Sequence, residues 1–266
     1  MARVVDGAQL ADDVEIGPFC TIGPQVELGA GVRLLSHVNV TGVSAIGERT
    51  IVYPFASLGT PPQSTHYRGG ATRLVVGSDC QIREGVTINP GTEDGGGLTT
   101  VGDRCFLMVN SHVGHDCTVG SNVTLANGVL IGGHVQVADH VFIGGNTAVH
   151  QHVRLGEGAM LAGASGVADD IIPFGFAVGV RAELVGLNII GLKRRGCGRE
   201  DIHRLRRAYR MLFMDPGTLA ERVVQANAAF AGDPWVGKIL SFIDDGKNRP
   251  LMMAASGGIE ENGAEP

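Results

Sequence analysis

Aliphatic residues recur at every sixth position along most of this 266-residue chain. They form three runs, and all 24 positions hold Ile, Leu or Val: Leu10, Ile16, Ile22, Leu28, Leu34, Val40, Ile46, Val52 and Leu58; then Val76, Ile82 and Ile88; then Val101, Leu107, Val113, Val119, Leu125, Ile131, Val137, Ile143, Val149, Leu155, Leu161 and Val167. A period of six fits neither an amphipathic helix nor a single alternating strand. It is typical of a solenoid built from hexapeptides, so the pattern predicts an all-β solenoid, a parallel β-helix.

A second inward position supports this fold. Four residues after many of the aliphatic residues stands a small or β-branched one, as at Val26, Cys80, Val86, Cys105 and Cys117. Three strands of about six residues each would close one triangular coil of about 18 residues. Each coil buries its inner face on its neighbours, so the core needs few large side chains. The composition agrees with such a core, because the chain has 41 glycines and only 5% of its residues are aromatic.

Two segments leave the period, and both are predicted to be long loops: residues 60–75 and 90–100. Long loops on a rigid scaffold tend to carry function. The period ends near residue 172, and helical spacing of apolar residues follows. We therefore expect a β-helix over 1–172, a C-terminal α-helical domain over 173–246, and a disordered tail over 247–266. Within the helical domain, helices are predicted over 199–213, 218–231 and 234–245.

Composition and charge restrict the partners and the compartment. The net charge of −6 and the pI of about 5.8 give no support for nucleic-acid binding. Residues 181–215 nevertheless hold nine of the 21 Lys and Arg against four acidic residues, which favours docking of an anionic partner, with a solvated helix face as the alternative. No apolar run has the length of a signal peptide or an integral membrane segment, so a cytoplasmic protein is expected. The five cysteines form no CxxC pair and are expected to be buried, reduced thiols.

Histidines gather in one stretch of the third run. Residues 18 apart should stack in adjacent coils, roughly 4.8 Å apart along the axis. Gly133 then lies over His115, His134 over Asp116, and His152 over His134. Five histidines of this stretch should lie near one surface strip beside Asp116: His112, His115, His134, His150 and His152. Histidine is the side chain best suited to acid–base chemistry near neutral pH.

These residues fit acyl transfer without a covalent intermediate. A histidine such as His115 can take the proton from an acceptor hydroxyl, which then attacks a thioester. A carboxylate can orient the imidazole, and a backbone N–H at Gly133 or its neighbours can stabilise the oxyanion. Asp116 follows His115 directly, and in a strand the two side chains would diverge. The orienting acid therefore either comes from elsewhere or depends on a local bend of the backbone.

Four segments identify a family resemblance: MVNSHVGHDCTVG (108–120), GGGLTTVG (95–102), IGGNTAVHQ (143–151) and GLNIIGLKRRG (186–196). They closely resemble the bacterial acyl-carrier-protein–UDP-N-acetylglucosamine O-acyltransferases, which perform the first step of lipid A synthesis. The resemblance runs in register from about residue 16 to residue 213. It implies a left-handed β-helix, a homotrimer with active sites between subunits, and two partners: acyl carrier protein, carrying a 3-hydroxyacyl group, and a UDP-sugar. Because the thioester donor is already activated, no metal and no cofactor are expected.

The resemblance also implies residue roles. His115 matches the family's general base, with Asp116 as the candidate orienting acid, and Gly133 matches the oxyanion-hole residue. Gly163 falls where the family's acyl groove ends. The remaining matched positions imply contacts with the substrates: His112, His134 and Gln151 in the cleft, and Asn188, Arg194 and Arg195 at the nucleotide.

Three positions depart from the family pattern. In the first loop the family has an acidic residue followed two positions later by Lys, and this chain has Ser64 and His66. At the nucleotide helix the family often has Glu, and this chain has Ile190. With the base kept and acceptor contacts changed, two acceptors besides UDP-N-acetylglucosamine stay open: a 3-amino analogue, which would be N-acylated, and a different sugar nucleotide.

Other classes also use this type of solenoid. A zinc lyase of the γ-carbonic-anhydrase type would place three histidines on Zn²⁺, and His112, His115 and His134 offer three. A sugar or serine acetyltransferase would use acetyl-coenzyme A, and a purely structural β-helix would have no reaction. The GGGLT loop, the KRR segment and the long helical end favour the acyl-carrier-protein-dependent enzyme.

Overall fold

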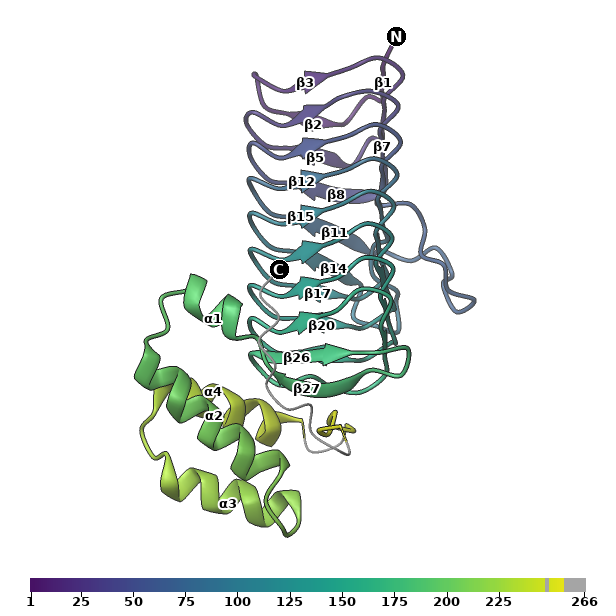
Figure 1. The fold of residues 1–266 in the computed structure, drawn as a ribbon. Helices are drawn as coiled ribbons and strands as arrows, with labels where there is room; N and C mark the ends of the chain where they lie inside the picture. The colour runs from purple at the N-terminus through teal and green to yellow at the C-terminus, as the bar shows by residue number, and fades with distance from the viewer. Residues whose placement is uncertain (247–248, 256–266) are drawn as a thin grey trace.

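The computed structural model describes residues 1–246 and 249–255, and its main body is a three-sided prism of stacked coils (Figure 1). It is a left-handed parallel β-helix followed by helices, as predicted. Each turn of the chain adds one short strand to each of three parallel sheets, which form the faces of the prism. The helices gather at the C-terminal end.

The three faces contain 27 strands among the described residues. The first face runs in the order β1 (Arg3–Val4), β4 (Thr21–Ile22), β7 (Asn39–Val40), β10 (Ser57–Leu58), β13 (Thr87–Ile88), β16 (His112–Val113), β19 (Leu130–Ile131), β22 (Ala148–Val149) and β25 (Gly166–Val167). The second face runs in the order β2 (Gln9–Leu10), β5 (Val26–Leu28), β8 (Val43–Ile46), β11 (Arg73–Val76), β14 (Leu98–Val101), β17 (Thr118–Val119), β20 (Gln136–Val137) and β23 (Arg154–Leu155). The third face contains β3 (Glu15–Ile16), β6 (Arg33–Leu34), β9 (Ile51–Val52), β12 (Gln81–Ile82), β15 (Phe106–Leu107), β18 (Thr124–Leu125), β21 (Phe142–Ile143), β24 (Met160–Leu161), β26 (Gly175–Val178) and β27 (Glu183–Leu187).

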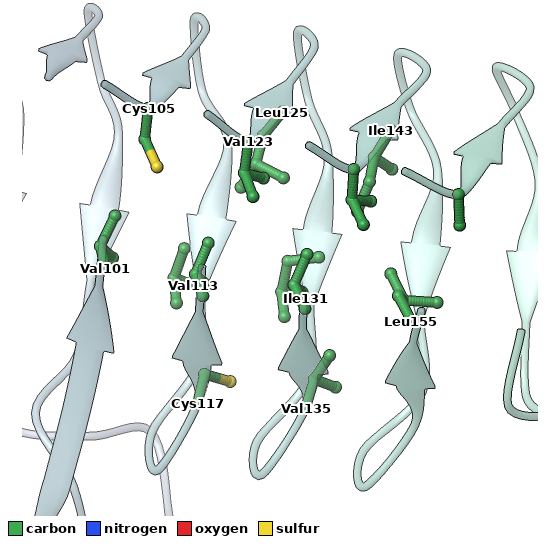
Figure 2. Packing of buried hydrophobic residues seen from close by; sticks show 14 of the residues in the cluster. Val101, Cys105, Val113, Cys117, Val123, Leu125, Ile131, Val135, Ile143 and Leu155 are labelled. Carbon is green, nitrogen blue, oxygen red and sulfur yellow. The ribbon is translucent and has the colours of Figure 1, made fainter. Parts of the chain in front are cut away.

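The predicted inward positions form the core. Every aliphatic residue of the sixfold pattern is buried except Leu10 and Ile16. These two lie in the first coil, which has a neighbour on one side only and so cannot bury its inner face completely. In the regular coils the strands pair with a shift of 18 residues, as in Val113 with Ile131 and Ile131 with Val149. Figure 2 shows the side chains of Val113 and Ile131 in neighbouring coils of the interior.

The corners of the prism explain how flat strands close into coils. Non-glycine residues with positive φ recur there, among them Asp116 (59°), His134 (61°) and His152 (67°). These three stand 18 residues apart and occupy the same edge, where the chain passes from the first face to the second. Asn, Asp and His are among the residues that adopt this left-handed conformation most readily. We call this the first–second edge, and name the second–third and third–first edges in the same way.

Both irregular segments leave the prism at the first–second edge. The connection from β10 to β11 spans residues 59–72, and that from β13 to β14 spans residues 89–97. The last residues of the two predicted loops, 73–75 and 98–100, belong to β11 and β14 instead. Glu93 joins the two loops, because its Oε1 accepts hydrogen bonds from the backbone N–H groups of Arg68 (3.1 Å) and Gly70 (2.5 Å). The loops therefore stand together beside one edge.

Four helices complete the described chain: α1 (Ile189–Arg194), α2 (Arg199–Phe213), α3 (Leu219–Ala229) and α4 (Pro234–Asp245). The residues that cap the N-termini of α3 and α4 directly precede these helices in the sequence. The Thr218 hydroxyl accepts from the N–H of Glu221 at 3.3 Å, and the Asp233 carboxylate caps α4, in which Pro234 takes the first position. The helices predicted over 199–213, 218–231 and 234–245 thus match α2, α3 and α4, and α1 is an additional short helix.

The end of the solenoid differs in detail from the sequence expectation. The sheet continues past residue 172, because β26 pairs in parallel with β24 and β27 pairs antiparallel with β26. Of the tail predicted to be disordered from residue 247, residues 247–248 and 256–266 lie outside the described residues. The described residues 249–255 pair with the prism end instead: Leu251 bridges Asp170, and Ala254 bridges Leu184. The buried Asp170 carboxylate holds this segment, since its Oδ1 accepts from Arg249 at 3.0 Å.

Candidate active site

The turn between β16 and β17 carries a histidine–carboxylate pair. His115 Nδ1 lies 2.8 Å from Asp116 Oδ2, although the two residues are adjacent in the chain. They do not lie in a strand, where their side chains would diverge. The positive φ of Asp116 turns its carboxylate back beneath the imidazole. The local bend therefore supplies the orienting acid, and the histidine does not need one from a distant segment.

The second loop fixes the Asp116 carboxylate. Its Oδ1 accepts from the backbone N–H of Thr92 at 2.9 Å, and its Oδ2 accepts from the Thr92 hydroxyl at 2.6 Å. The N–H of Asp116 donates to the Thr99 hydroxyl at 2.8 Å, and the carboxylate side chain is 1% exposed. Although burial raises the pKa of Asp116, the hydrogen bonds from Thr92 and His115 outweigh it and hold this pKa below its usual value. Asp116 is thus ionised near neutral pH and accepts the Nδ1 proton of His115.

Gly133 lies directly over the His115 ring. A Cβ atom built on Gly133 would stand 2.6 Å from Cε1 and 2.7 Å from Nε2 of His115, so no larger residue fits without displacing the ring. The N–H of Gly133 has no hydrogen-bond acceptor in the described part of the chain. Since Nδ1 of His115 faces Asp116, the tautomer that satisfies both groups leaves a lone pair on Nε2. A proton acceptor and a free backbone donor therefore lie side by side.

Two further histidines flank this pair. The His134 ring meets the His115 ring edge-on, with centroids 5.0 Å apart, and its Nε2 lies 3.9 Å from Asp116 Oδ2. His112 shares a 2.7 Å hydrogen bond between its Nδ1 and the Thr87 hydroxyl. Burial lowers the pKa of both flanking rings; His115 lowers that of His112 further, and the Asp116 charge partly opposes the shift at His134. Both flanking rings are therefore expected to be neutral at pH 7 and available as hydrogen-bonding groups.

The first–second edge continues this group over the next coil and into the loops. His152 stacks on His134 with centroids 4.4 Å apart. Gln151 is exposed in the same turn, and its backbone packs against Gly132. His66 is exposed on the first loop, where its N–H donates to the Ser64 hydroxyl at 3.2 Å. The edge thus combines the histidine–carboxylate pair, several polar side chains and two loops.

The hydrogen bonds of this site fit a metal centre less well than they fit a general base. Ligand atoms of His115, Asp116 and His134 lie within 4.8 Å of one another, so the spacing alone would admit an ion. Both Asp116 oxygens, however, already accept hydrogen bonds, and Nδ1 of His112 faces the Thr87 hydroxyl. The zinc-lyase alternative requires three convergent histidine nitrogens, whereas His115 is turned toward a carboxylate. The arrangement matches a positioned general base.

Comparison with known proteins decides the family. A family model for domain 2 of UDP-N-acetylglucosamine O-acyltransferase matches residues 170–252, and a model for bacterial transferase hexapeptide repeats matches residues 98–133. The acyl-[acyl-carrier-protein]–UDP-N-acetylglucosamine O-acyltransferase of Azorhizobium caulinodans is 58% identical over 260 residues, 98% of this chain and 96% of that protein. The chain belongs to this O-acyltransferase family. The resemblance predicted from the sequence, and with it the prediction of an acyltransferase, is confirmed.

Solved structures of this O-acyltransferase family have the same fold. One UDP-N-acetylglucosamine acyltransferase, 39% identical, matches with a TM-score of 0.91 over 96% of this chain and 98% of its own. The enzyme from Moraxella catarrhalis, 34% identical, has a TM-score of 0.91 and covers 94% of this chain and 97% of its own. The β-helix and the helical end are therefore shared together, as one architecture.

The residues that the family resemblance assigns to the nucleotide lie on another edge of the prism. Asn188 caps α1, with its Oδ1 accepting from Gly191 N–H at 2.9 Å, and its Nδ2 donates to the carbonyl of Gly158 at 3.0 Å. Arg195 forms an ion pair with Glu157, at the second–third edge. Arg194 is exposed beside it. Within one protomer these groups anchor or border α1, and they do not meet His115.

Gly163 lies on the remaining edge. It stands in the turn between β24 and β25, at the third–first edge, and is exposed. A Cβ there would approach only the backbone of Gly145, whose oxygen would be 3.2 Å away. The predicted site residues are thus divided among all three edges of one prism.

Sequence reasoning missed the groups that hold Asp116. Thr92 and Thr99 belong to the second loop and its following strand, and the loop was singled out without either residue. The signal was present in the spacing, because Thr99 stands one coil below Cys117, next to Asp116. The Thr92 contact, by contrast, depends on the three-dimensional path of an irregular loop, which the six-residue period does not describe. In the described part of the chain, no helix has the length and apolarity required to cross a membrane.

Proposed function

We propose that this protein transfers a 3-hydroxyacyl group from acyl carrier protein to the 3-hydroxyl of UDP-N-acetylglucosamine, the first step of lipid A synthesis. The 2.8 Å contact of His115 Nδ1 with the buried Asp116 carboxylate, beneath the free N–H of Gly133, carries this proposal. It combines a general base and an oxyanion donor at one point, as acyl transfer to a hydroxyl requires. The 58% identical relative is named for the same donor and acceptor classes.

The reaction follows from these positions. Nε2 of His115 takes the proton of the sugar hydroxyl while the hydroxyl oxygen bonds to the thioester carbonyl carbon. The carbonyl electrons move to oxygen, and the oxyanion accepts a hydrogen bond from Gly133 N–H. Asp116 stabilises the imidazolium formed in this step. The C–S bond then breaks, and the departing thiolate takes the proton from Nε2, so that an ester and a free thiol leave and the base is regenerated.

We infer a homotrimer from the division of the site. His115 lies on the first–second edge, Arg194 beside the second–third edge, and Gly163 on the third–first edge. A single substrate complex that uses all of these residues needs more than one protomer. A closed threefold arrangement brings different edges of neighbouring prisms together at three equivalent clefts. Within such a cleft, His112, His134, Gln151 and His66 would line the sugar and donor side, and Asn188, Arg194 and Arg195 the nucleotide side.

The basic surface of the helical end supports an anionic donor protein. Acyl carrier protein is acidic, and attraction to exposed arginines on and beside α2 would bring its acyl arm toward the cleft. Exposed cationic residues of this surface include Lys193, Arg194, Arg199, Arg207 and Arg210.

The open turn at Gly163 leaves room for the end of a long acyl chain. A cytoplasmic location follows from the two soluble substrates.

A specific observation favours a second acceptor, a 3-amino analogue of the sugar nucleotide. The exposed loop position His66 and its neighbour Ser64 replace an acidic residue and Lys, and Ile190 on α1 is 53% exposed where the family often has Glu. An amine nucleophile needs the same base and the same oxyanion donor, and the product is then an amide. Three changed positions near the acceptor, with the base retained, are what such a switch would require.

One assay separates these reactions. Purified protein is incubated with a panel of 3-hydroxyacyl–acyl carrier proteins and with UDP-N-acetylglucosamine or its 3-amino analogue, and products are identified by mass spectrometry. Ester product from the hydroxyl sugar supports the main proposal, and product from the amino sugar alone supports the second. An absence of product with both acceptors would refute both, and acetyl-coenzyme A would then be the next donor to test.

A further inference from the structure

Cys117 is buried directly behind the peptide that carries the Gly133 N–H. Its side chain is 0% exposed, and Sγ lies 3.0 Å from the carbonyl oxygen of Gly132. Figure 2 shows the Cys117 side chain pointing into the interior of the prism. Burial raises the pKa of this thiol to about 12, so the sulfur carries its proton and acts as the donor. Among the described residues, Cys117 Sγ is the one hydrogen-bond partner of the Gly132 oxygen.

The carbonyl of Gly132 and the N–H of Gly133 belong to the same planar peptide group. In a trans peptide these two bonds point in opposite directions. A hydrogen bond that draws the Gly132 oxygen inward toward Cys117 therefore directs the Gly133 N–H outward, to the side where the His115 ring lies. The rotation of this peptide sets the direction in which the oxyanion donor points.

We propose that Cys117 is a positioning residue for the reaction: its S–H···O=C bond to Gly132 sets the Gly132–Gly133 peptide so that the Gly133 N–H is aimed at the oxyanion. This inference rests on the proposed acyl transfer and deepens it. Cys117 touches no reacting atom and acts through the peptide. Preorganised donors contribute strongly because no reorientation is needed during the reaction.

The prism contains a matched arrangement at an edge without the histidine pair. Cys105 is equally buried, and its Sγ lies 3.1 Å from the carbonyl oxygen of Gly120 at the second–third edge. The amide that follows this carbonyl, Ser121 N–H, is already bonded to Asp139 Oδ1 at 2.7 Å. The same type of thiol contact therefore exists where the adjoining amide has no catalytic use. A purely structural role for these thiols predicts the same effect of substitution at both sites.

Neighbouring coils show which substitutions the fold accepts. Val135 takes the place of Cys117 one coil further and is fully buried. Thr147 makes the corresponding contact at another edge, with its hydroxyl donating to the Ala162 carbonyl at 2.9 Å. Cys117→Val thus keeps the shape and removes the donor, whereas Cys117→Thr keeps a donor. Cys105→Val is the control at the second–third edge, where the adjoining amide of Ser121 is already hydrogen-bonded to Asp139.

The test compares steady-state kinetics of Cys117→Val, Cys117→Thr and Cys105→Val with wild type. Loss of a whole oxyanion donor costs about 100- to 1,000-fold in kcat, so a misdirected one should cost roughly 5- to 50-fold. We expect this fall for Cys117→Val with KM nearly unchanged, partial recovery in Cys117→Thr, and near wild-type kcat in Cys105→Val. The pH dependence of kcat/KM should keep its position, because the His115–Asp116 pair is untouched. Equal effects of the two valine variants, or a shifted pH profile for Cys117→Val, would overturn the proposal.

A crystal structure of Cys117→Val separates this proposal from the proposed function. The expected result is a rotated Gly132–Gly133 peptide, with the Gly132 oxygen released from its inward direction. An unchanged peptide would contradict the positioning role, whatever the activity. If the wild-type protein transfers no acyl group, the proposed function fails, and the peptide orientation still decides whether Cys117 sets it.

Discussion

His115 Nδ1 and Asp116 Oδ2 lie 2.8 Å apart although the two residues are neighbours in the chain. The contact exists because Asp116 occupies the left-handed corner position of its coil, with φ of 59°. Every coil needs such a corner in order to turn, and in this coil the corner residue also orients the base. Thr92 donates two hydrogen bonds to the carboxylate, so the pair is held in place before any substrate binds.

His115→Gln is expected to lower kcat by about 100- to 10,000-fold, because positioned acid–base groups contribute that much. Glutamine keeps a polar side chain at the surface and cannot take a proton from the acceptor. His152→Gln on the same edge is the control, and we expect its kcat to stay close to wild type. Equal losses in the two variants, measured in the acyl-transfer assay, would assign the effect to the surface rather than to the base.

Asp116→Asn should reduce kcat by roughly 100- to 10,000-fold, with the fold retained. Its amide N–H would face Nδ1 of His115 and favour the tautomer with the proton on Nε2, which cannot act as a base. The measurement is kcat and KM with saturating donor. A KM effect without a kcat effect would show that Asp116 serves binding and not the base.

Asp116 should also contribute to the acid sensitivity of the protein. Its folded pKa lies below its ordinary value of 3.8, so its stabilising effect is complete above that ordinary value and is lost as the pH falls through the lower folded pKa. The urea midpoint of wild type should therefore decrease on acidification from about pH 5 to about pH 3 by more than that of Asp116→Asn. Parallel decreases in the two proteins would contradict the lowered pKa.

Gly163→Met should shift the preference among 3-hydroxyacyl donors toward shorter chains. The glycine is exposed, and a Cβ there meets only the backbone of Gly145, with the carbonyl oxygen 3.2 Å away. A small shift of that backbone would admit the side chain, which would then fill the end of the groove. A change of one methylene in an apolar pocket alters selectivity by about 10- to 200-fold. The ratio of kcat/KM for long and short donors measures the shift. A variant that keeps the wild-type ratio, with an unchanged melting temperature, would place the end of the groove elsewhere.

Arg194 and Arg195 are adjacent but should respond differently to alanine substitution. Arg195 pairs with Glu157, lies over the rings of Phe174 (5.4 Å) and Trp235 (5.9 Å), and has a side chain 19% exposed. Its removal should cost roughly 1.5–3 kcal/mol of unfolding free energy, the range for hydrogen bonds to charged groups. Arg194 is exposed, so Arg194→Ala should leave the stability unchanged and raise KM for the UDP-sugar. Denaturation curves and KM values of both variants, measured together, test this division; an unchanged KM in Arg194→Ala would exclude the nucleotide contact.

The regular part of the molecule follows from local repetition, which explains why it was predictable. An inward residue such as Ile131 has its neighbours Val113 and Val149 18 residues before and after it, so one period describes the core of the regular coils. The helices α3 and α4 were predictable for the same reason, because the capping residues Thr218 and Asp233 directly precede them in the sequence. The stacking of Gly133 over His115 and of His152 over His134 followed from the same 18-residue spacing.

By itself, the sequence determined the β-helix, its core, the position of the histidine edge and, through its motifs, the family. Only the tertiary structure decided what holds the base, because the six-residue period describes neither the contact of the Asp116 carboxylate with His115 nor the path of the Thr92 loop. The same holds for the ion pair of Arg195 with Glu157, 38 residues away, which the period does not describe. Periodic contacts repeat at fixed sequence separation and can be read along the chain, whereas contacts made by loops and chain ends depend on a path that the complete fold alone defines.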